Sequence, residues 1–255
     1  MDSESANIAL EQGTEKNVDF EDLPFKDSFD LYHYEKCALK AGYSCIAGVD
    51  EAGRGPLAGP VVVAACILPV DFPIVGLNDS KLLTEKKREE LYHLLSQRED
   101  VTFSISILDH EEIDRINIYQ ATLKGMQLAV RKLKKRPDFI FIDGNASPTL
   151  RCPHKTLVDG DKKSASIAAA SIIAKVTRDR LMLKYHKMYP SWNFLKHKGY
   201  GTKEHLEKIK LHGVSPIHRK SFGPVRISLE NKKLPKELLL EQMDWDMLNR
   251  METLK

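Results

Sequence analysis

The feature of this sequence that most constrains its fold is a pair of apolar, β-rich runs joined by a loop rich in glycine and proline. The runs are SCIAGVD (44–50) and VVVAACIL (61–68), and the loop between them reads EAGRGPLAGP. Short apolar runs bounded by turn residues predict buried strands, because helices of soluble proteins usually need longer stretches. A sheet is therefore expected to begin at residue 44.

The rest of the chain alternates between strand-like and helix-like patterns. Further strands are expected at 101–108, 138–143 and 155–158. Helices are expected at 29–42, ending at Gly42, and at 84–96, 117–135 and 164–189. From Pro190 onward no strand is expected, and the C-terminal portion is predicted to be helical. Strands that come first in succession and then alternate with helices predict an α/β fold with a mixed sheet.

Charge is distributed unevenly along the chain. Residues 1–40 hold ten acidic and four basic side chains, a net charge of −6, so the remainder carries +9 and the whole chain +3. Residues 1–28 lack clear periodicity and are expected to form a mobile tail. The basic body favours a polyanionic partner such as a nucleic acid.

Composition argues against a membrane protein and against a cysteine-based framework. No run approaches the ~18 apolar residues that a spanning helix needs, and the N-terminus lacks the basic and apolar regions of a signal peptide. A cytoplasmic location without membrane contact is expected. The four cysteines are widely spaced and form no CxxC pair, which predicts free thiols rather than disulfides or zinc ligands: Cys37, Cys45, Cys66 and Cys152.

Acidic residues stand at the ends of the predicted strands. Asp50 and Glu51 end the first run, and Asp143 ends the run FIFID. Ligands bind at the carboxyl ends of strands in open α/β sheets, and carboxylate oxygens at such a place suit Mg²⁺ or Mn²⁺. An ordinary solvated turn is the alternative at each position, and the pair Asp143-Gly144 is itself a turn signal.

A further acidic candidate precedes the alanine-rich helix expected at 164–189. Asp159 and Asp161 both qualify on composition. Either carboxylate would serve equally well as a cap of that helix. The residues alone do not decide between them.

Seven ordered segments carry a resemblance to a known family. They are GVDEAGRGPLAGPVV (48–62), LNDSKLLTEKKRE (77–89), NIYQAT (117–122), FIDGN (141–145), GDKKSASIAAASIIAKVTRD (160–179), HKGYGTKEH (197–205) and HRKSFGPV (218–225). In this order, from about residue 44 to residue 225, they resemble ribonuclease HII of the bacterial type, in the type 2 ribonuclease H family. The resemblance implies a ribonuclease H-like, mixed five-stranded sheet flanked by helices, with a helical C-terminal portion. It divides the chain into an acidic, partly disordered extension (1–43), a catalytic core (44–189) and a helical substrate-binding region with a tail (190–255).

The resemblance implies an active site of four carboxylates, which would hold two ions, Mg²⁺ or Mn²⁺. On this sequence they are Asp50, Glu51, Asp143 and Asp161. Asp161 is chosen over Asp159 because the family's acid stands directly before the polar residues that lead into SIAAASIIAK. Asp179 also matches the family, lies well inside the predicted helix, and is expected to play a structural or supporting role.

The activity implied by the resemblance is that of an endonuclease. It would hydrolyse the RNA strand of RNA–DNA hybrids and cut on the 5′ side of ribonucleotides embedded in duplex DNA, leaving a 5′-phosphate and a 3′-hydroxyl. Both nucleic acids are thus the expected partners, and the enzyme is expected to be a monomer that serves DNA replication and repair.

Six matched residues would contact the substrate in a member of this family. They are Gly53, Arg54, Gly55, Ser80, Lys81 and Tyr200. The GRG backbone contacts the 2′-hydroxyl, and the tyrosine stacks on the following deoxyribose and senses the same hydroxyl. The serine and lysine lie in a loop that binds the nucleic-acid backbone. Residues 194–220, with seven lysines and arginines and four histidines against two glutamates, are the best candidate for gripping the DNA strand.

Two other interpretations were weighed against this resemblance. Ribonuclease HIII carries a sizeable N-terminal substrate-binding domain, and the 43 residues before the first strand are too few and too polar for one. A non-catalytic hybrid-binding protein of the same fold would lack at least one of the four acids, and all four are present.

The C-terminal tail has an amphipathic pattern of its own. Residues 234–255 predict a helix with apolar side chains near one face. Gln242, Met243 and Trp245 weakly resemble the peptides by which some relatives contact a sliding clamp, although no aromatic pair closes the motif. Packing of this helix on the enzyme's own body is the favoured interpretation.

Overall fold

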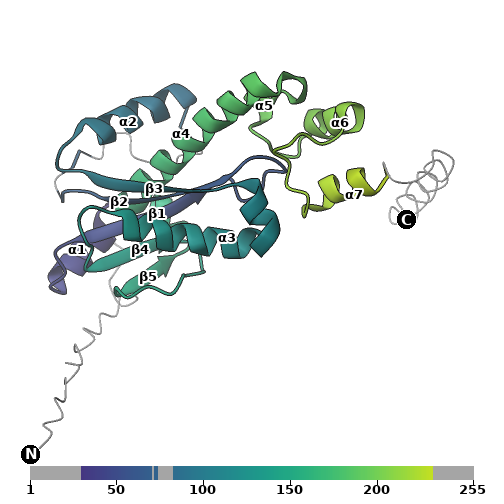
Figure 1. Ribbon diagram of the computed structural model, residues 1–255. Coiled ribbons are helices and arrows are strands. Elements are labelled where there is room, and N and C mark those ends of the chain that lie inside the picture. The colour runs from purple at the N-terminus through teal and green to yellow at the C-terminus, as the bar shows by residue number, and fades with distance from the viewer. Residues whose placement is uncertain (1–29, 71, 74–82, 232–255) are drawn as a thin grey trace, which may run out of the picture.

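The computed structural model describes residues 30–70, 72–73 and 83–231. A five-stranded sheet with the order β3-β2-β1-β4-β5 forms its centre (Figure 1). Antiparallel pairs join β1 to β2 and β2 to β3, whereas β1–β4 and β4–β5 are parallel. The strands are β1 (Ile46–Ala52), β2 (Val61–Ile67), β3 (Thr102–Leu108), β4 (Phe139–Asp143) and β5 (His154–Leu157). All five predicted strands and the mixed, ribonuclease H-like sheet are confirmed.

Helices cover both faces of this sheet (Figure 1). On one face α4 lies along β1 and β2, with α1 and α2 beside it, and α3 covers the other face. The described helices are α1 (His33–Lys40), α2 (Glu85–Gln97), α3 (His110–Lys132), α4 (Ala165–Met188), α5 (Phe194–His197), α6 (Lys203–His212) and α7 (Gly223–Asn231), with short 3₁₀ turns η1 (Gly160–Lys162) and η2 (Pro190–Trp192). The helical C-terminal portion is confirmed as far as residue 231.

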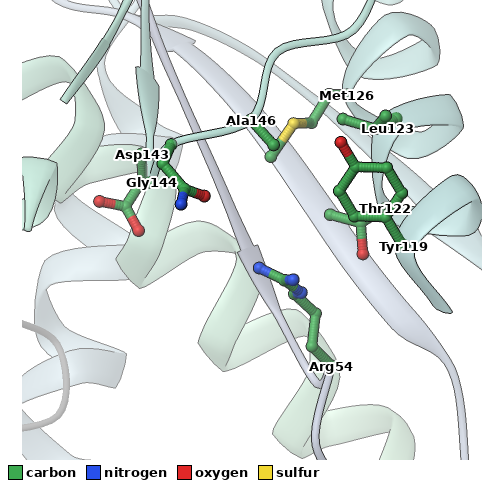
Figure 2. Close-up of a pocket in the computed structure, with 9 residues that line it drawn as sticks. Arg54, Tyr119, Thr122, Leu123, Met126, Asp143, Gly144 and Ala146 are labelled. Carbon is green, nitrogen blue, oxygen red and sulfur yellow. The ribbon is translucent and has the colours of Figure 1, made fainter. Parts of the chain in front are cut away.

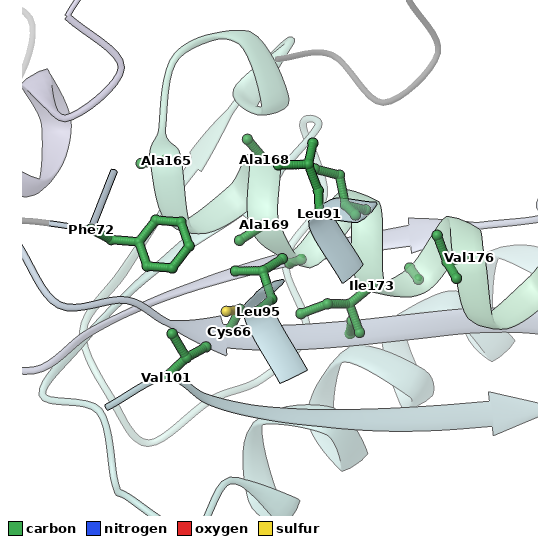
Figure 3. Close-up of a cluster of buried hydrophobic side chains, with 14 of the residues drawn as sticks. Cys66, Phe72, Leu91, Leu95, Val101, Ala165, Ala168, Ala169, Ile173 and Val176 are labelled. Carbon is green, nitrogen blue, oxygen red and sulfur yellow. The ribbon is translucent and has the colours of Figure 1, made fainter. Parts of the chain in front are cut away.

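The alanine-rich first half of α4 allows this helix to lie directly against the sheet. A Cβ atom on Gly48 of β1 would come within 2.1 Å of the backbone of Ser166, so no larger residue fits between strand and helix. Figure 3 shows the cluster that α4, β2 and α2 form above this contact, which includes Cys66, Leu91, Leu95, Ala168, Ala169 and Ile173. Burial of this apolar surface is what holds the helix in register with β1.

Side-chain caps fix where several of these helices begin. The side-chain oxygens of Thr84, Asp109, Ser164 and Thr202 each accept a hydrogen bond from the backbone N–H three residues later. Each bond satisfies an N–H group that has no partner inside its helix. The predicted starts of α2 and α4 therefore agree with the structure to within one residue.

The helix predicted at 117–135 differs from the observed α3 at both ends. α3 begins at His110, because Asp109 caps a first segment, and Asn117 then interrupts it with φ 66°. The side chain of Asn117 accepts a hydrogen bond from Gln120 N (3.0 Å) and so caps a second segment, whose start is the one that the sequence predicts. The helix ends at Lys132, three residues early, where Leu133 is extended and buried.

Other predictions concern cysteines, membranes and the termini. All four cysteines are free thiols, as expected. None of the helices in the described ranges is long and apolar enough to cross a bilayer. The tail predicted at 1–28 and the helix predicted at 234–255 lie outside the described residues.

Candidate active site

The predicted acidic strand ends lie at one edge of the sheet. β1 and β4 are parallel neighbours, so Asp50 and Glu51 on the first strand and Asp143 on the second are at carboxyl ends that point the same way. Asp50 is only 5% exposed, whereas Glu51 and Asp143 are half-buried. The structure thus brings together three of the four acids that the sequence predicts.

The carboxyl group of Asp50 is in an unfavourable electrostatic environment. Burial raises its pKa well above the ordinary value, and the carboxylates of Glu51 and Asp143 raise it further. A side-chain hydrogen bond with Ser171 of α4 and a bond from the backbone N–H of Glu51 (2.6 Å) act in the opposite direction. A divalent cation would offset this repulsion, because it favours the charged form of every carboxylate around it.

The turn before α4 distinguishes Asp161 from Asp159, which sequence composition does not. Asp161 lies in η1 and is buried, whereas the side chain of Asp159 is 61% exposed and pairs with Lys162 Nζ at 3.2 Å. Gly160 N donates to Asp143 Oδ1 at 2.7 Å, which binds the turn to the end of β4. Asp161 therefore lies one residue from a direct contact with Asp143. The carboxyl ends of β1 and β4, with Asp50, Glu51 and Asp143, are called the acidic strand edge below.

These four side chains fit a divalent metal in chemistry, since all their donors are oxygen atoms. The mutual repulsion at Asp50 is a second sign of fit, because it is relieved only by protonation or by a cation. Within the described ranges, no three His, Cys, Asp or Glu side chains are grouped closely enough to hold an ion as they stand. Closing the acids around an ion consequently requires side-chain rotation.

A small pocket opens beside Asp143 (Figure 2). Arg54 reaches into it from the loop after β1, and Arg54 Nη1 also donates to Glu51 Oε1 at 3.2 Å. The helix α3 supplies the opposite wall, with the side chains of Tyr119, Thr122, Leu123 and Met126. A guanidinium next to carboxylates, facing open space, is suited to a phosphate group.

A buried arginine from the C-terminal region holds the loop that contains GRG. Arg219 donates from Nη2 to Gly53 O (2.6 Å), from Nη1 to Arg54 O (2.8 Å) and from Nε to Gly59 O (2.9 Å). Its side chain is fully buried, and burial lowers its pKa to about 9. All five N–H donors of a guanidinium lie in one plane, so three bonds to one loop fix the path of that loop.

A second buried arginine, from α4, holds the same loop. Arg178 donates from Nε to Pro60 O (3.1 Å), from Nη2 to Ala58 O (3.2 Å) and from Nη1 to Lys198 O (3.0 Å). Gly53 has φ 97°, and a Cβ atom there would lie 2.0 Å from Arg178 Nε. The glycine is therefore required both by its backbone conformation and by this contact.

Tyr200 lies beside the GRG loop, as its predicted role requires. The residue is 44% exposed, and a Cβ atom on Gly55 would be 3.7 Å from its Cε1 atom. The guanidinium of Arg178 stands 5.8 Å from the ring centroid. The loop and the tyrosine, separated by some 145 positions in the chain (55 to 200), thus form one surface.

The predicted nucleic-acid grip at 194–220 needs correction in part. Of its charged and titratable residues, Arg219 and three of the four histidines are buried: His197, His205 and His218. These four side chains lie in the interior of this region, so the exposed lysines and His212 are what remain available to a polyanion. Ser80 and Lys81 lie outside the described residues.

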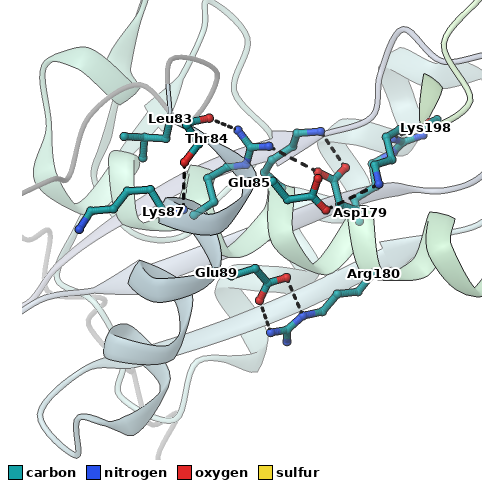
Figure 4. A network of polar contacts seen from close by, with 11 residues as sticks. Leu83, Thr84, Glu85, Lys87, Glu89, Asp179, Arg180 and Lys198 are labelled. Carbon is teal, nitrogen blue, oxygen red and sulfur yellow. Dashed lines mark hydrogen bonds and ion pairs between the residues drawn. The ribbon is translucent and has the colours of Figure 1, made fainter. Parts of the chain in front are cut away.

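Asp179 lies in a group of ion pairs between α4 and α2. Its carboxylate accepts a hydrogen bond from Lys175 Nζ at 2.7 Å and lies 3.9 Å from Arg88 Nη2 of α2 (Figure 4). The same view shows Arg180 of α4 paired with Glu89 of α2. These ion pairs join α2 to α4 along their shared side.

One face of α4 has a role that the sequence patterns did not predict. Ser171 bonds with Asp50, Lys175 pairs with Asp179, and Arg178 binds the GRG loop. Their spacing of i, i+4 and i+7 places them on a single helical face. Polar residues at that spacing within an alanine- and isoleucine-rich helix were the available signal.

A mixed sheet of this strand order, with acidic side chains gathered at the ends of β1 and β4, defines the class of ribonuclease H-like proteins with a carboxylate site. Comparison with known proteins gives the family. The model of the ribonuclease HII family matches residues 47–225. The ribonuclease HII of Desulfitobacterium hafniense (strain DSM 10664 / DCB-2) is 54% identical over 200 residues, 78% of this chain and 76% of that protein. The ribonuclease HII of Endomicrobium trichonymphae is 52% identical over 208 residues, 81% of this chain and 96% of that protein. The chain therefore belongs to the ribonuclease HII family.

Solved structures agree with this assignment. The crystal structure of the ribonuclease H2 from Pyrococcus horikoshii OT3 superposes with a TM-score of 0.64 at 27% identity, covering 75% of this chain and all of that one. The ribonuclease HII of Archaeoglobus fulgidus, solved in complex with PCNA, has a TM-score of 0.60 at 24% identity, covering 71% of this chain and 96% of that one. A ribonuclease HIII, Bst-RNase HIII in complex with Mn²⁺, has a TM-score of 0.59 at 19% identity over 73% of this chain and 69% of that one. The last two show the fold alone.

Proposed function

We propose that Asp50, Glu51, Asp143 and Asp161 are the metal ligands of this enzyme and that the GRG loop and Tyr200 select the site of cleavage. As a ribonuclease HII, the chain is a metal-dependent endonuclease that cleaves RNA in RNA–DNA hybrids and at ribonucleotides embedded in DNA. One observation carries the proposal. The acidic strand edge and the surface formed by the GRG loop and Tyr200 are joined by the short segment between Glu51 and Gly55.

The reaction is hydrolysis of one phosphodiester bond. A water oxygen forms a bond to phosphorus, the bond from phosphorus to the upstream O3′ breaks, and O3′ leaves as a hydroxyl, so that the 5′-phosphate stays on the ribonucleotide. Two divalent ions, Mg²⁺ or Mn²⁺, would supply charge for activating water and stabilising the leaving oxygen. Bst-RNase HIII was solved with Mn²⁺, which makes that ion one of the two to be tested.

The protein's own side chains hold and orient the reacting phosphate. Ser171 and the backbone N–H of Glu51 form hydrogen bonds with the Asp50 carboxylate and orient it at the end of β1. Arg54, in the pocket beside Asp143, is placed to bind a non-bridging phosphate oxygen. No covalent nucleophile is needed for this reaction.

Recognition of a ribonucleotide must depend on its 2′-hydroxyl, because this group alone distinguishes RNA from DNA at a given sugar. Gly53 and Gly55 allow a backbone to approach the sugar closely. Tyr200 stands beside Gly55 with its ring partly exposed, so it can stack on the next sugar and donate a hydrogen bond from its hydroxyl.

The proposed setting is that of a monomer acting on cytoplasmic RNA–DNA hybrids and ribonucleotide-containing duplexes. The exposed lysines between residues 194 and 220 would bind the DNA strand through its phosphates. The Archaeoglobus fulgidus relative was solved with PCNA, so clamp binding is the one further partner worth testing. The segment that would carry it here, 234–255, lies outside the described residues.

The test is cleavage of a DNA duplex that carries a single ribonucleotide, compared with the same duplex made wholly of DNA. Cleavage on the 5′ side of the ribonucleotide is expected, and none in the DNA control. Tyr200→Phe should weaken cleavage more than duplex binding, by roughly 2- to 10-fold for one hydrogen bond of ~0.5–1.5 kcal/mol. Equal loss of binding and cleavage would mean that Tyr200 is a platform only.

A further inference from the structure

Three histidines form a buried cluster directly beneath Tyr200. His197, His205 and His218 are 7%, 0% and 0% exposed. The rings of His197 and His205 are stacked at a centroid distance of 4.2 Å, and those of His205 and His218 are 5.1 Å apart. Phe194 packs its ring against all three. Neither the carboxylate site nor the substrate contacts described above use these rings.

The hydrogen bonds determine which nitrogen of each ring carries the proton. His205 Nδ1 lies 2.9 Å from the carbonyl oxygen of Tyr200, which only accepts, so His205 Nδ1 must carry a hydrogen. Ser215 N donates to His218 Nδ1 at 2.8 Å, so His218 Nδ1 carries no hydrogen. His218 Nε2 therefore carries the hydrogen of a neutral ring and donates it to His205 Nε2 at 3.0 Å.

The third ring is assigned by the same reasoning. His197 Nε2 lies 2.7 Å from the carbonyl oxygen of Trp192 and must donate to it. Gly199 N donates to His197 Nδ1 at 3.2 Å. All three imidazoles are consequently neutral, and each has a single tautomer that is compatible with its neighbours.

These bonds run in one direction and end at the tyrosine. The donors follow one another from Ser215 N–H through His218 and His205 to Tyr200 C=O. On the N-terminal side of the same residue, Tyr200 N donates to His197 O at 2.9 Å. The backbone of Tyr200 is thus held on both sides by the cluster.

From this geometry we propose that His205, supported by His218, is a positioning residue that sets the placement of Tyr200 against the GRG loop and thereby the selection of ribonucleotide junctions. The proposal rests on the proposed role of Tyr200. The Tyr200 carbonyl accepts hydrogen bonds from His205 Nδ1 and, within the same turn, from Thr202 N at 2.8 Å. The imidazole is the side-chain donor of this pair, and it leaves the tyrosine side chain free to face the substrate. Loss of the imidazole donor should shift the ring, while the bond from Thr202 keeps the turn in place.

The surroundings of the cluster keep it neutral. Burial lowers the pKa of His205 to about 4 and that of His218 to about 3. The titratable and charged groups facing the rings are His110 on α3, His186 on α4, Lys196 on α5 and Glu204 on α6. Only one of them is an acid, and Lys196 Nζ pairs with it at 2.8 Å. At neutral pH the donor chain is therefore intact.

Two variants separate the donor from the packing of the ring. His205→Asn places an amide N–H near the position of Nδ1 and can still bond to the Tyr200 carbonyl. His205→Gln places its amide near the position of Nε2, toward His218, and cannot do so. Both remove the imidazole and its stacking on His197, so they cost similar packing. His93→Asn and His93→Gln, on the exposed surface of α2, are the matched controls.

The measurement is kcat/KM on the duplex with one ribonucleotide divided by kcat/KM on a long RNA–DNA hybrid, at neutral pH. For His205→Gln we expect this ratio to fall roughly 2- to 10-fold, because the one hydrogen bond from His205 that positions Tyr200 is lost. His205→Asn should keep most of the parent ratio, although both variants melt at lower temperature. The His93 variants should leave the ratio and the melting temperature unchanged.

A second background tests whether His205 acts through Tyr200. In Tyr200→Ala the ratio should already be low, and adding His205→Gln should not lower it further. An equal fall of the ratio in His205→Asn and His205→Gln would overturn the proposal, and so would an additional fall in the Tyr200→Ala background. If Tyr200→Ala alone keeps the parent ratio, the proposed role of Tyr200 has failed instead, and the assignment of His205 fails with it.

Discussion

Replacing Arg219 by lysine tests whether the GRG loop depends on the shape of a guanidinium rather than on its charge. Arg219 is fully buried and bonds to three carbonyl oxygens of the loop, from three different nitrogens. A lysine has one nitrogen, which cannot reach all three, so we count two lost bonds. At ~1.5–3 kcal/mol for each bond to a charged group the loss is about 3–6 kcal/mol, and water returning to the exposed Arg54 carbonyl reduces it to about 2–4 kcal/mol.

The assay is urea unfolding followed by circular dichroism, without metal or substrate, beside cleavage of the duplex with one ribonucleotide. Arg226→Lys on α7 is the matched control, because its side chain is 63% exposed and its ion pair with Glu230 is long, at 4.0 Å. The control should stay within ~0.5 kcal/mol of the parent. A loss below ~1 kcal/mol for Arg219→Lys, with normal cleavage, would refute the view that these three bonds hold the loop.

Four further predictions follow from the site and its surroundings. Asp50→Asn and Asp143→Asn should each abolish cleavage, and Asp50→Asn should raise the melting temperature in EDTA because it removes a repelled carboxylate; near-normal turnover of either variant at ordinary Mg²⁺ would contradict the ligand assignment. Asp161→Asn should be severely impaired and Asp159→Asn much less so, and the reverse order in the same assay would show that the exposed acid is the ligand. Between pH 6.5 and 4 the unfolded chain binds a proton at His205 that the folded chain does not, so the free energy of unfolding decreases as the pH is lowered through this range. In urea unfolding, the decrease in this free energy from pH 7 to pH 5 should be about 2 kcal/mol smaller in His205→Asn than in the parent. An equal decrease in both proteins would argue against a neutral, buried ring. Deleting residues 234–255 should lower the melting temperature with little effect on clamp binding, and a pull-down that loses the clamp at unchanged melting temperature would reverse that view.

Much of the fold could be predicted because apolar runs report burial directly. The first four strands are short, mainly apolar and bounded by turn residues, and all five were found within two residues of their predicted limits. Two helix starts were predicted to within one residue, and the structure shows that Thr84 and Ser164 cap them. The start of α3 was missed because Asn117 has the character of a cap, and it is one, but for the second of two segments.

The acids could be proposed from the sequence because strand ends concentrate ligands, yet their register depended on the resemblance. Asp159 and Asp161 differ by two positions, and composition gives no reason to prefer either. Burial distinguishes them in the structure, because η1 turns one carboxylate inward and leaves the other paired with Lys162. A 3₁₀ turn of three residues has too little sequence signal to predict which way its side chains face.

The support of the GRG loop could not be predicted because it depends on contacts between distant segments. Arg178 and Arg219 look like ordinary surface charges in a basic sequence, and both are buried among backbone carbonyls. The histidines of 194–220 were interpreted as part of a basic surface for the same reason. Sequence patterns predict that a charged residue is exposed unless a partner side chain can be recognised. Backbone carbonyl partners cannot be recognised in this way, because every residue has a carbonyl group.

The position of Arg219 late in the chain determines the order in which parts of the site can form during synthesis. Arg219 is added to the growing chain 166 residues after Gly53, whose carbonyl it binds, and after every one of the four acids. Because chains fold from the N-terminus as they are made, the acidic strand edge can assemble while the loop still lacks its buried donor. On the proposed roles, a newly made molecule thus acquires its four metal ligands before the loop that selects the ribonucleotide is fixed in place.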